Sequence, residues 1–165
     1  MAISHVRMDY RLIHGQILVA WNSSYPSDEI LVCNDRVAAD PMQVQLLKAV
    51  APSGVRVRIF NLNDAAEYIN DPANAEKKLF IIVKYAEDAV GLMDHGVKFD
   101  SINLGNQAYV RGSEKLNKSV YLTEPNIKAI KELHDRGLSM TARMLPQDSS
   151  AEIWPTIQKL FAKWL

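Results

Sequence analysis

The sequence of 165 residues contains a single cysteine, Cys33, which excludes a disulfide framework and a zinc site built from several cysteines. Long apolar runs are also missing. The longest extends from Leu79 to Val83, far short of the roughly 20 residues that a membrane-spanning helix needs. The first residues show no apolar core and no cleavage site of a signal peptide. We therefore expect a cytoplasmic protein without a membrane anchor, in which Cys33 is buried and unreactive.

An excess of charge of one sign is lacking, because Lys+Arg 19 balance Asp+Glu 19. Nucleic acids select basic surfaces, so we do not expect one as a partner. Neither a Gly-x-Gly-x-x-Gly pattern nor a Gly-Lys-Ser/Thr phosphate loop occurs, which argues against dinucleotide binding and a nucleotide-binding P-loop. The spacing of the Cys and His residues gives no metal site. We expect neither a metal ion nor any other cofactor.

Short apolar segments alternate with amphipathic helices, and no repeat or flexible linker divides the chain, so we expect one domain over residues 1–165. This alternation predicts a three-layer α/β/α fold with a doubly wound, mainly parallel sheet of about six to seven strands. We expect strands at 2–8, 30–33, 55–59, 79–83, 101–104, 119–122 and 138–144. In a C-terminal helix we expect Pro155 as the first residue and one common face formed by Ile157, Leu160, Phe161 and Trp164.

Sheets of this type carry their sites beyond the carboxyl ends of the strands. In the loop after the first strand, His14 precedes Gly15 and a helix expected from Gln16. The imidazole would then lie near free backbone N–H groups at a helix N-terminus, where anions bind. Arg11 adds a permanent positive charge suited to a phosphate. We expect Asp9 to hydrogen-bond one ring nitrogen of His14 and leave the other as the nucleophile.

This arrangement suits a histidine that accepts and donates a phosphoryl group. Arg11 and the N–H groups of Gly15, Gln16 and Ile17 would hold the phosphoryl oxygens. Two other readings remain open. His14 could act as a general base, with Arg11 anchoring a substrate carboxylate, or the loop could be a structural turn in an interaction module.

The remaining histidines lack this setting, because His5 lies on a strand and His95 and His134 lie near helix C-termini. Among the other loops, Asn34 and Asp35 follow the second strand, where Asp35 could support Arg11 or simply cap a turn. Gly105 and Asn106 follow a later strand. Either these two residues line a pocket that includes the His14 loop, or they form a simple turn.

The run Asp9-x-Arg11-Leu12-Ile13-His14-Gly15-Gln16 closely resembles the active-site signature of the enzyme IIB component of the mannose/fructose/sorbose/N-acetylgalactosamine-type phosphotransferase system, a sugar importer driven by phosphoenolpyruvate. The resemblance covers essentially the whole chain. Weaker matches follow in order: Val32-x-Asn34-Asp35, Ala39-Asp40, Ala51-Pro52-x-Gly54-Val55, Ile102-Asn103-Leu104-Gly105-Asn106 and Arg143-x-x-Pro146-x-Asp148.

The resemblance implies a parallel α/β fold and a protein-Nπ-phosphohistidine–sugar phosphotransferase. His14 would take the phosphoryl group from phospho-IIA on Nδ1 and pass it to a sugar held by the membrane components IIC and IID. A degenerate member that only binds or regulates is the alternative.

The sugar and the oligomeric state, a homodimer included, are not determined by the sequence, although overall similarity leans slightly toward an amino sugar such as N-acetylgalactosamine. Tyr10 departs from the acidic or polar residue common in the family. This departure leaves sugar subtype and donor affinity open, but not phosphorylation.

Overall fold

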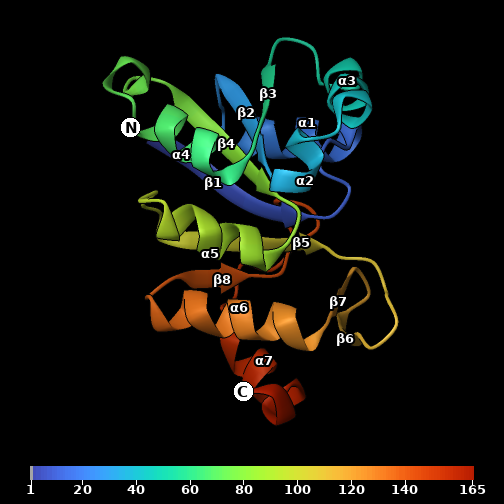
Figure 1. The fold of residues 1–165 in the computed structure, drawn as a ribbon. Helices are drawn as coiled ribbons and strands as arrows, with labels where there is room; N and C mark the ends of the chain where they lie inside the picture. The colour runs from blue at the N-terminus through green and yellow to red at the C-terminus, as the bar shows by residue number, and fades with distance from the viewer. Residues whose placement is uncertain (1) are drawn as a thin grey trace.

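The computed structural model describes residues 2–165 and has a parallel sheet at its centre (Figure 1). The sheet has six strands in the order β3-β2-β4-β1-β5-β8. All pairings within it are parallel, so the carboxyl ends of all its strands meet at one edge. The strands are β1 (Ala2–Asp9), β2 (Glu29–Cys33), β3 (Arg56–Phe60), β4 (Lys78–Val83), β5 (Ser101–Asn106) and β8 (Ser139–Thr141).

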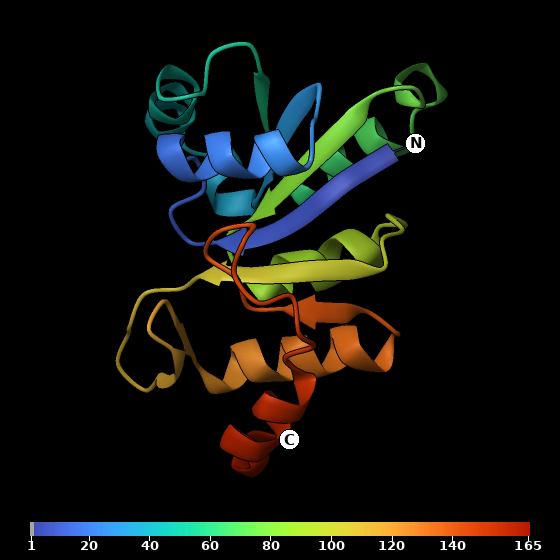
Figure 2. The ribbon, with the colours of Figure 1, turned by 180° about the vertical axis from the view of Figure 1, so that it is seen from behind.

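Helices cover both faces of the sheet and bury a separate apolar core on each. Helices α1 (Gly15–Ser24), α2 (Asp35–Ala38) and α3 (Pro41–Ala49) lie on one face, shown in Figure 2. Helices α4 (Leu62–Asn70), α5 (Ala86–Asp94) and α6 (Glu124–Asp135) cover the other face, shown in Figure 1. Strand β2 serves both cores, because Leu31 packs on the second face and Val32 on the first. The predicted three-layer α/β/α class is confirmed.

Two of the predicted strands differ in the structure. Segment 119–122 does not join the main sheet: β7 (Val120–Leu122) pairs antiparallel with β6 (Glu114–Asn117) in a separate hairpin. The last strand, β8, ends at Thr141 and not at 144. It ends there because the backbone of Arg143 is hydrogen-bonded to the side chain of Asn103 and not to a strand. Asn103 accepts the Arg143 N–H at 2.9 Å and donates to the Arg143 carbonyl at 2.9 Å.

The C-terminal helix also differs from the prediction in where it begins and ends. Helix α7 (Trp154–Leu160) begins one residue earlier than predicted, so Pro155 is its second residue. Of the residues expected on one face, Ile157 and Phe161 are buried, but Leu160 is 45% exposed. The helix ends at Leu160, and a short 3-10 turn (Ala162–Trp164) follows. The 3-10 helices of the described residues also include Pro72–Asn74, before β4. No helix in residues 2–165 is both long and apolar enough to cross a bilayer.

His5 is an aromatic part of the packing beneath α1. Its ring stacks on Trp21 and on Tyr25, with ring centroids 4.5 Å apart in both cases. Burial, together with the positive charges of Arg143 and Arg7, lowers the pKa of His5 to about 3. This histidine therefore stays neutral in the folded protein at ordinary pH.

His5 should make the folded protein sensitive to mild acid. The unfolded chain binds a proton at His5 near pH 6.5, whereas the folded protein does so only near pH 3, so stability falls as the pH drops below 6.5. Between pH 7 and pH 5 the loss from this group is about 2 kcal/mol. Urea unfolding at both pH values measures it. His5→Phe, which keeps the stacking, should remove most of this difference, and an unchanged difference would contradict the account.

Candidate active site

The loop after β1 turns sharply and is held from both sides. The Leu12 N–H donates to the Asp9 carbonyl at 3.0 Å, and the Tyr10 N–H donates to the Asn106 carbonyl of β5 at 3.1 Å. Leu12 adopts a positive φ of 62°, a conformation that costs a non-glycine residue about 1–2 kcal/mol. The Leu12 and Ile13 side chains are buried in the core beneath α1. Burial of these two side chains offsets the strain and fixes the position of the next residue, His14.

His14 is the exposed N-cap residue of α1. Its carbonyl accepts the Leu18 N–H at 3.0 Å, which closes the first helical turn. The amides of Gly15, Gln16 and Ile17 precede that turn and have no carbonyl partner within the helix. The His14 side chain does not cap them, and the first turn of α1 contains no acidic residue. These N–H groups therefore remain available to an anion beside the imidazole.

The carboxylate of Asp9, the last residue of β1, binds two arginines. Its Oδ1 accepts from the Arg11 N–H at 3.0 Å and from Arg11 Nε at 3.1 Å. Its Oδ2 accepts from Arg11 Nη2 at 3.1 Å and from Arg7 Nη2 at 3.2 Å. Asp9 is 2% exposed, so these bonds form away from water.

The expected role of Asp9 therefore needs correction. The hydrogen bonds of its carboxylate all go to Arg7 and Arg11, and none joins it to His14. The physical reason is that the arginine fork matches the two carboxylate oxygens, and the turn also brings the Arg11 N–H to Oδ1. Asp9 positions the cation of the site and does not fix the tautomer of the histidine.

Arg7 extends the hydrogen bonds around Asp9 into the interior of the protein. It is 1% exposed, and burial lowers its pKa while the neighbouring Asp9 opposes that shift. Its Nη1 donates to the Arg143 carbonyl at 2.9 Å. Its guanidinium lies 5.2 Å from the ring centroid of Trp21, and the Arg143 guanidinium lies 5.1 Å from the same ring. The buried charge is stabilised by one carboxylate, one carbonyl and one aromatic face.

Gly105 makes room for this guanidinium. A Cβ atom at position 105 would lie 2.2 Å from Cζ of Arg7. Gly105 and Asn106 are the last residues of β5, and neither forms the simple turn that the sequence left open. Gly105 admits Arg7, and Asn106 anchors the loop through its carbonyl.

Asn34 and Asp35 serve a neighbouring part of the structure. Asn34 caps α2 by accepting the Val37 N–H at 2.9 Å, and it donates to the Asp88 carboxylate at 3.0 Å. Burial raises the pKa of Asp88. Asp35 accepts the N–H of Leu62, the first residue of α4, at 2.8 Å. It forms no hydrogen bond that supports Arg11. Strand β4 lies between their strand, β2, and the strand that leads to His14. Both residues line a separate cavity of about 350 Å³.

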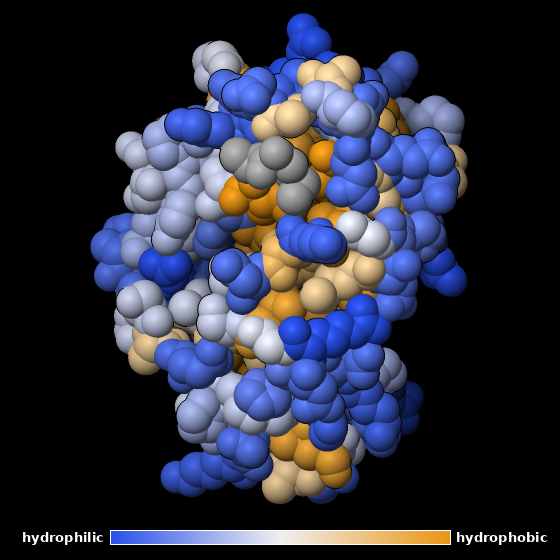
Figure 3. Space-filling view, turned by 90° about the vertical axis from the view of Figure 1, so that its left-hand side faces the viewer, coloured by the Kyte–Doolittle hydropathy of each residue, from blue (hydrophilic) through white to orange (hydrophobic). Residues whose placement is uncertain are grey.

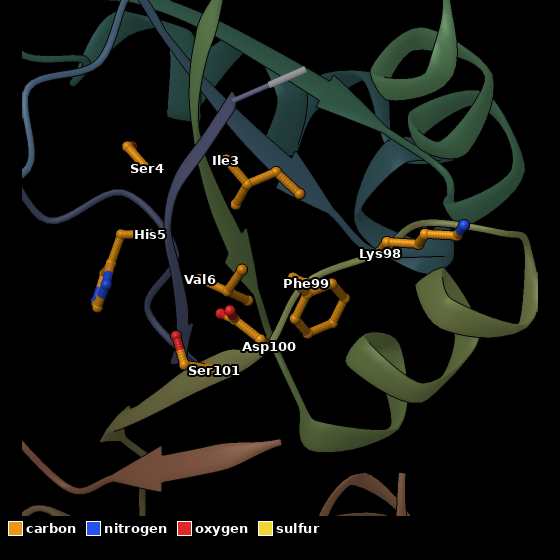
Figure 4. A pocket seen from close by; sticks show the side chains of 8 residues that line it. All are labelled: Ile3, Ser4, His5, Val6, Lys98, Phe99, Asp100 and Ser101. Atoms are coloured by element: carbon orange, nitrogen blue, oxygen red, sulfur yellow. The ribbon is translucent and has the colours of Figure 1, made fainter. Parts of the chain in front are cut away.

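A second hollow lies at the opposite, amino-terminal edge of the sheet. Figure 3 views this edge and shows apolar side chains gathered in a depression. The cavity of about 490 Å³ lies where the first residues of β1 and β5 diverge. Figure 4 shows Ile3, Val6 and Phe99 beside it, while the His5 ring points away from these three. The loop of His14 lies at the other end of β1.

Comparison with known proteins agrees with this geometry. The family model described as PTS system sorbose subfamily IIB component matches residues 3–163. The chain belongs to this family. The sequence is 30% identical over 163 residues to the sorbose-specific EIIB component of Lacticaseibacillus casei, covering 99% of each chain. It is 32% identical over 160 residues to the mannose-specific EIIAB component of Escherichia coli K12, covering 97% of this chain and 50% of that one.

Solved IIB structures share the fold. The IIBSor domain of the sorbose permease from Klebsiella pneumoniae superposes with a TM-score of 0.92 at 30% identity, over 97% of this chain and 98% of that one. An N-acetyl-galactosamine IIB component from Streptococcus pyogenes gives a TM-score of 0.82 at 30% identity, over 94% and 97%. The family predicted from the signature around His14 is confirmed.

Sequence reasoning missed two arginines that organise the site of this IIB protein. Arg7 lies in a strand between the apolar residues Val6 and Met8, and a charged residue needs a partner if it is buried there. Arg143 belongs to one of the weak matches, where no role was assigned to it. The signal available in the sequence was Gly105, a glycine inside a strand, which marks a close approach of another group.

Gly105→Ala should destabilise the protein by about 3 kcal/mol. The new methyl group displaces the Arg7 guanidinium and breaks a buried pair with Asp9. Gly15→Ala is a matched control, because a Cβ at position 15 meets nothing within 4 Å and the φ is not positive. Urea unfolding of both variants measures the effect. Equal stability of the two variants would contradict this prediction, because the Arg7 guanidinium could then move aside without loss of stability.

Proposed function

We propose that this IIB protein is a phosphocarrier that accepts a phosphoryl group on His14 and transfers it onward to a sugar during import. The observation that supports this most is the exposed imidazole of His14 at the start of α1, next to amides without helical partners. A carrier histidine must be accessible, because it meets a donor and an acceptor in turn. A histidine stacked between other rings and only partly exposed, such as His5, cannot do this.

The donor is the phosphohistidine of a IIA protein, and the acceptor is a sugar bound by the membrane components IIC and IID. The E. coli relative named EIIAB supports the first assignment, since its name combines the A and B components in one chain, of which the present chain matches half. Relatives are named for sorbose, mannose, fructose and N-acetylgalactosamine. The transported sugar belongs to this group. Transfer takes place at the inner face of the cell membrane.

The chemistry needs a nucleophile, an anion cradle and a fixed cation. Nδ1 of neutral His14 attacks phosphorus in line, and the bond from phosphorus to the donor imidazole breaks as the new bond forms. Negative charge spreads over the three equatorial oxygens, so positioned N–H groups and cations supply most of the catalysis. The N–H groups of Gly15, Gln16 and Ile17 donate hydrogen bonds to these oxygens.

Arg11 supplies the cation. It donates to Asp9 through Nε and Nη2, and within residues 2–165 no partner is assigned to its Nη1. The Nη1 donors therefore remain for a phosphoryl oxygen. Because Asp9 already holds the guanidinium, little side-chain freedom is lost when the phosphoryl group arrives.

His14→Ala should abolish phosphorylation by phosphoenolpyruvate, the two general phosphotransferase proteins and a IIA protein. Intact mass under non-acidic conditions measures the gain of one acid-labile phosphoryl group. His95→Ala is the matched control, because His95 is also exposed and also lies at a helix end. A His14→Ala protein that still gains the phosphoryl group would overturn the assignment.

Arg11→Met should slow the transfer about ten- to hundred-fold, because a charge-assisted contact worth about 1.5–3 kcal/mol is lost. The single-turnover rate from phospho-IIA measures this effect. Arg11→Lys keeps the charge but loses the fork to Asp9, so its rate should fall between those of the wild type and Arg11→Met. Wild-type rates for both variants would remove Arg11 from the site.

A further inference from the structure

Positive charge gathers in two segments of the protein. Segment 107–122 contains the hairpin of β6 and β7, and segment 154–165 contains α7 and the 3-10 turn that follows it. Together they hold five of the 19 basic residues but one of the 19 acidic residues, Glu114. The protein is neutral as a whole, so the rest of the chain carries an excess of negative charge. The basic residues, all exposed, are Arg111, Lys115, Lys118, Lys159 and Lys163.

The two segments lie next to each other in space. Lys163 of the 3-10 turn forms an ion pair with Glu114 at the start of β6. Figure 1 and Figure 2 both place the hairpin and the C-terminal turns around α6, at the end of the molecule opposite α3. The hairpin also follows β5, whose last residue, Asn106, accepts the Tyr10 N–H of the His14 loop. The positively charged end of the molecule therefore adjoins the edge of the sheet that carries His14.

Neighbouring carboxylates do not cancel this charge. The four basic residues other than Lys163 form no salt bridge within residues 2–165. Glu124, just after the hairpin, lies 3.7 Å from Lys128 and is paired with it. Glu152, just before α7, accepts backbone N–H groups of the fold. Even with Glu152 and the carboxylate of Leu165 counted, the basic residues remain in excess.

Exposed apolar side chains lie among these charges. Leu160 and Leu165 are 45% and 41% exposed, and Tyr109 and Val110, in the loop before β6, are 65% and 49% exposed. Trp164, beside Leu165, is partly exposed. Basic, aliphatic and large aromatic side chains that are exposed together are typical of protein segments at the headgroup boundary of an anionic membrane.

We propose that these two segments form a binding surface for an anionic lipid bilayer. We call residues 107–122 and 154–165 the basic end. Its five cationic side chains contact lipid phosphates, and Val110, Leu160 and Leu165 enter between the headgroups. Binding of this kind holds the protein at the membrane, with the His14 edge beside the bilayer. The proposal goes beyond the carrier function and does not depend on it.

The composition of the basic end favours a lipid surface over a protein or a nucleic acid. Four of its five basic residues are lysines, which are depleted at protein interfaces relative to the rest of the protein surface. Protein partners also anchor their side chains in pockets, and none of these residues lines the cavities at the two edges of the sheet. A nucleic acid backbone offers phosphates but no apolar layer for the exposed leucines.

Co-sedimentation with lipid vesicles tests the proposal. The unphosphorylated protein is mixed at low salt with vesicles of phosphatidylglycerol and phosphatidylcholine in equal parts, and separately with vesicles of phosphatidylcholine alone. We expect binding to the anionic vesicles, little binding to the neutral ones, and a loss of affinity as salt is added. Each basic residue near an anionic surface strengthens binding about fivefold. Lys115→Glu combined with Lys118→Glu should therefore weaken binding at least about a hundred-fold.

Two single variants of the basic end have matched controls on α3. Lys159→Glu should weaken binding about twenty-fold, and Leu160→Gln should weaken it several-fold because apolar contact is lost. Lys48→Glu and Leu46→Gln make the same changes at exposed positions of α3, at the opposite end of the molecule. Both controls should keep the wild-type affinity within about twofold, because salt screens distant charges. Thermal unfolding by circular dichroism should show that all variants remain folded.

Three outcomes would overturn the proposal. The wild type fails to bind anionic vesicles at low salt, or the variants of the basic end lose no more affinity than the controls. In the third outcome, only vesicles that contain IIC and IID bind, which shows that a protein occupies the surface. The carrier function is tested separately, because phospho-IIA should phosphorylate His14 equally well in the wild type and in every variant in solution. Absence of phosphorylation in the wild type contradicts the carrier function and leaves the lipid surface intact.

Discussion

The carboxylate of Asp9 holds together the parts of the protein that make the site. It lies at the end of the central strand β1, where Oδ1 binds the partly buried Arg11 and Oδ2 binds both Arg11 and the buried Arg7. Without it, the buried charge of Arg7 would lack its counter-ion, a loss of several kcal/mol. Through Arg7 the carboxylate is connected to Arg143 and the C-terminal segment, and through Arg11 it reaches the proposed phosphoryl site. The stability of the fold and the position of Arg11, the cation of the proposed site, thus depend on the same ion cluster.

The position of His14 has a different origin. Leu12 accepts a strained backbone conformation, and its buried side chain together with that of Ile13 holds the loop against the core. The imidazole is left outside, at a helix N-terminus without a capping side chain. His5 shows the opposite solution, because stacking and burial make it a neutral part of the packing. Accessibility distinguishes the two histidines more clearly than chemical type, and an accessible histidine is what a carrier requires.

Much of the architecture could be predicted from the sequence, because alternation of apolar strands and amphipathic helices specifies layers and strand ends. The loop with His14 could be recognised for the same reason, since it follows the first strand. The partners of polar side chains could not. Whether Asp9 binds His14 or Arg11 depends on the turn at Leu12, and the partner of the Asn34 amide depends on where Asp88 lies. Leu160 fits a helical face on paper, but the helix ends at that residue.

The central claim is that His14 carries the phosphoryl group in a cradle formed by the start of α1. Nitrogen-15 NMR of the phosphorylated protein, kept above neutral pH, tests this claim most directly. The account predicts that the ring-nitrogen shift marking phosphorylation at Nδ1 appears on His14, together with large changes at the amides of Gly15, Gln16 and Ile17. Phosphorylation at another histidine, or at His14 with these amides unchanged, would contradict it.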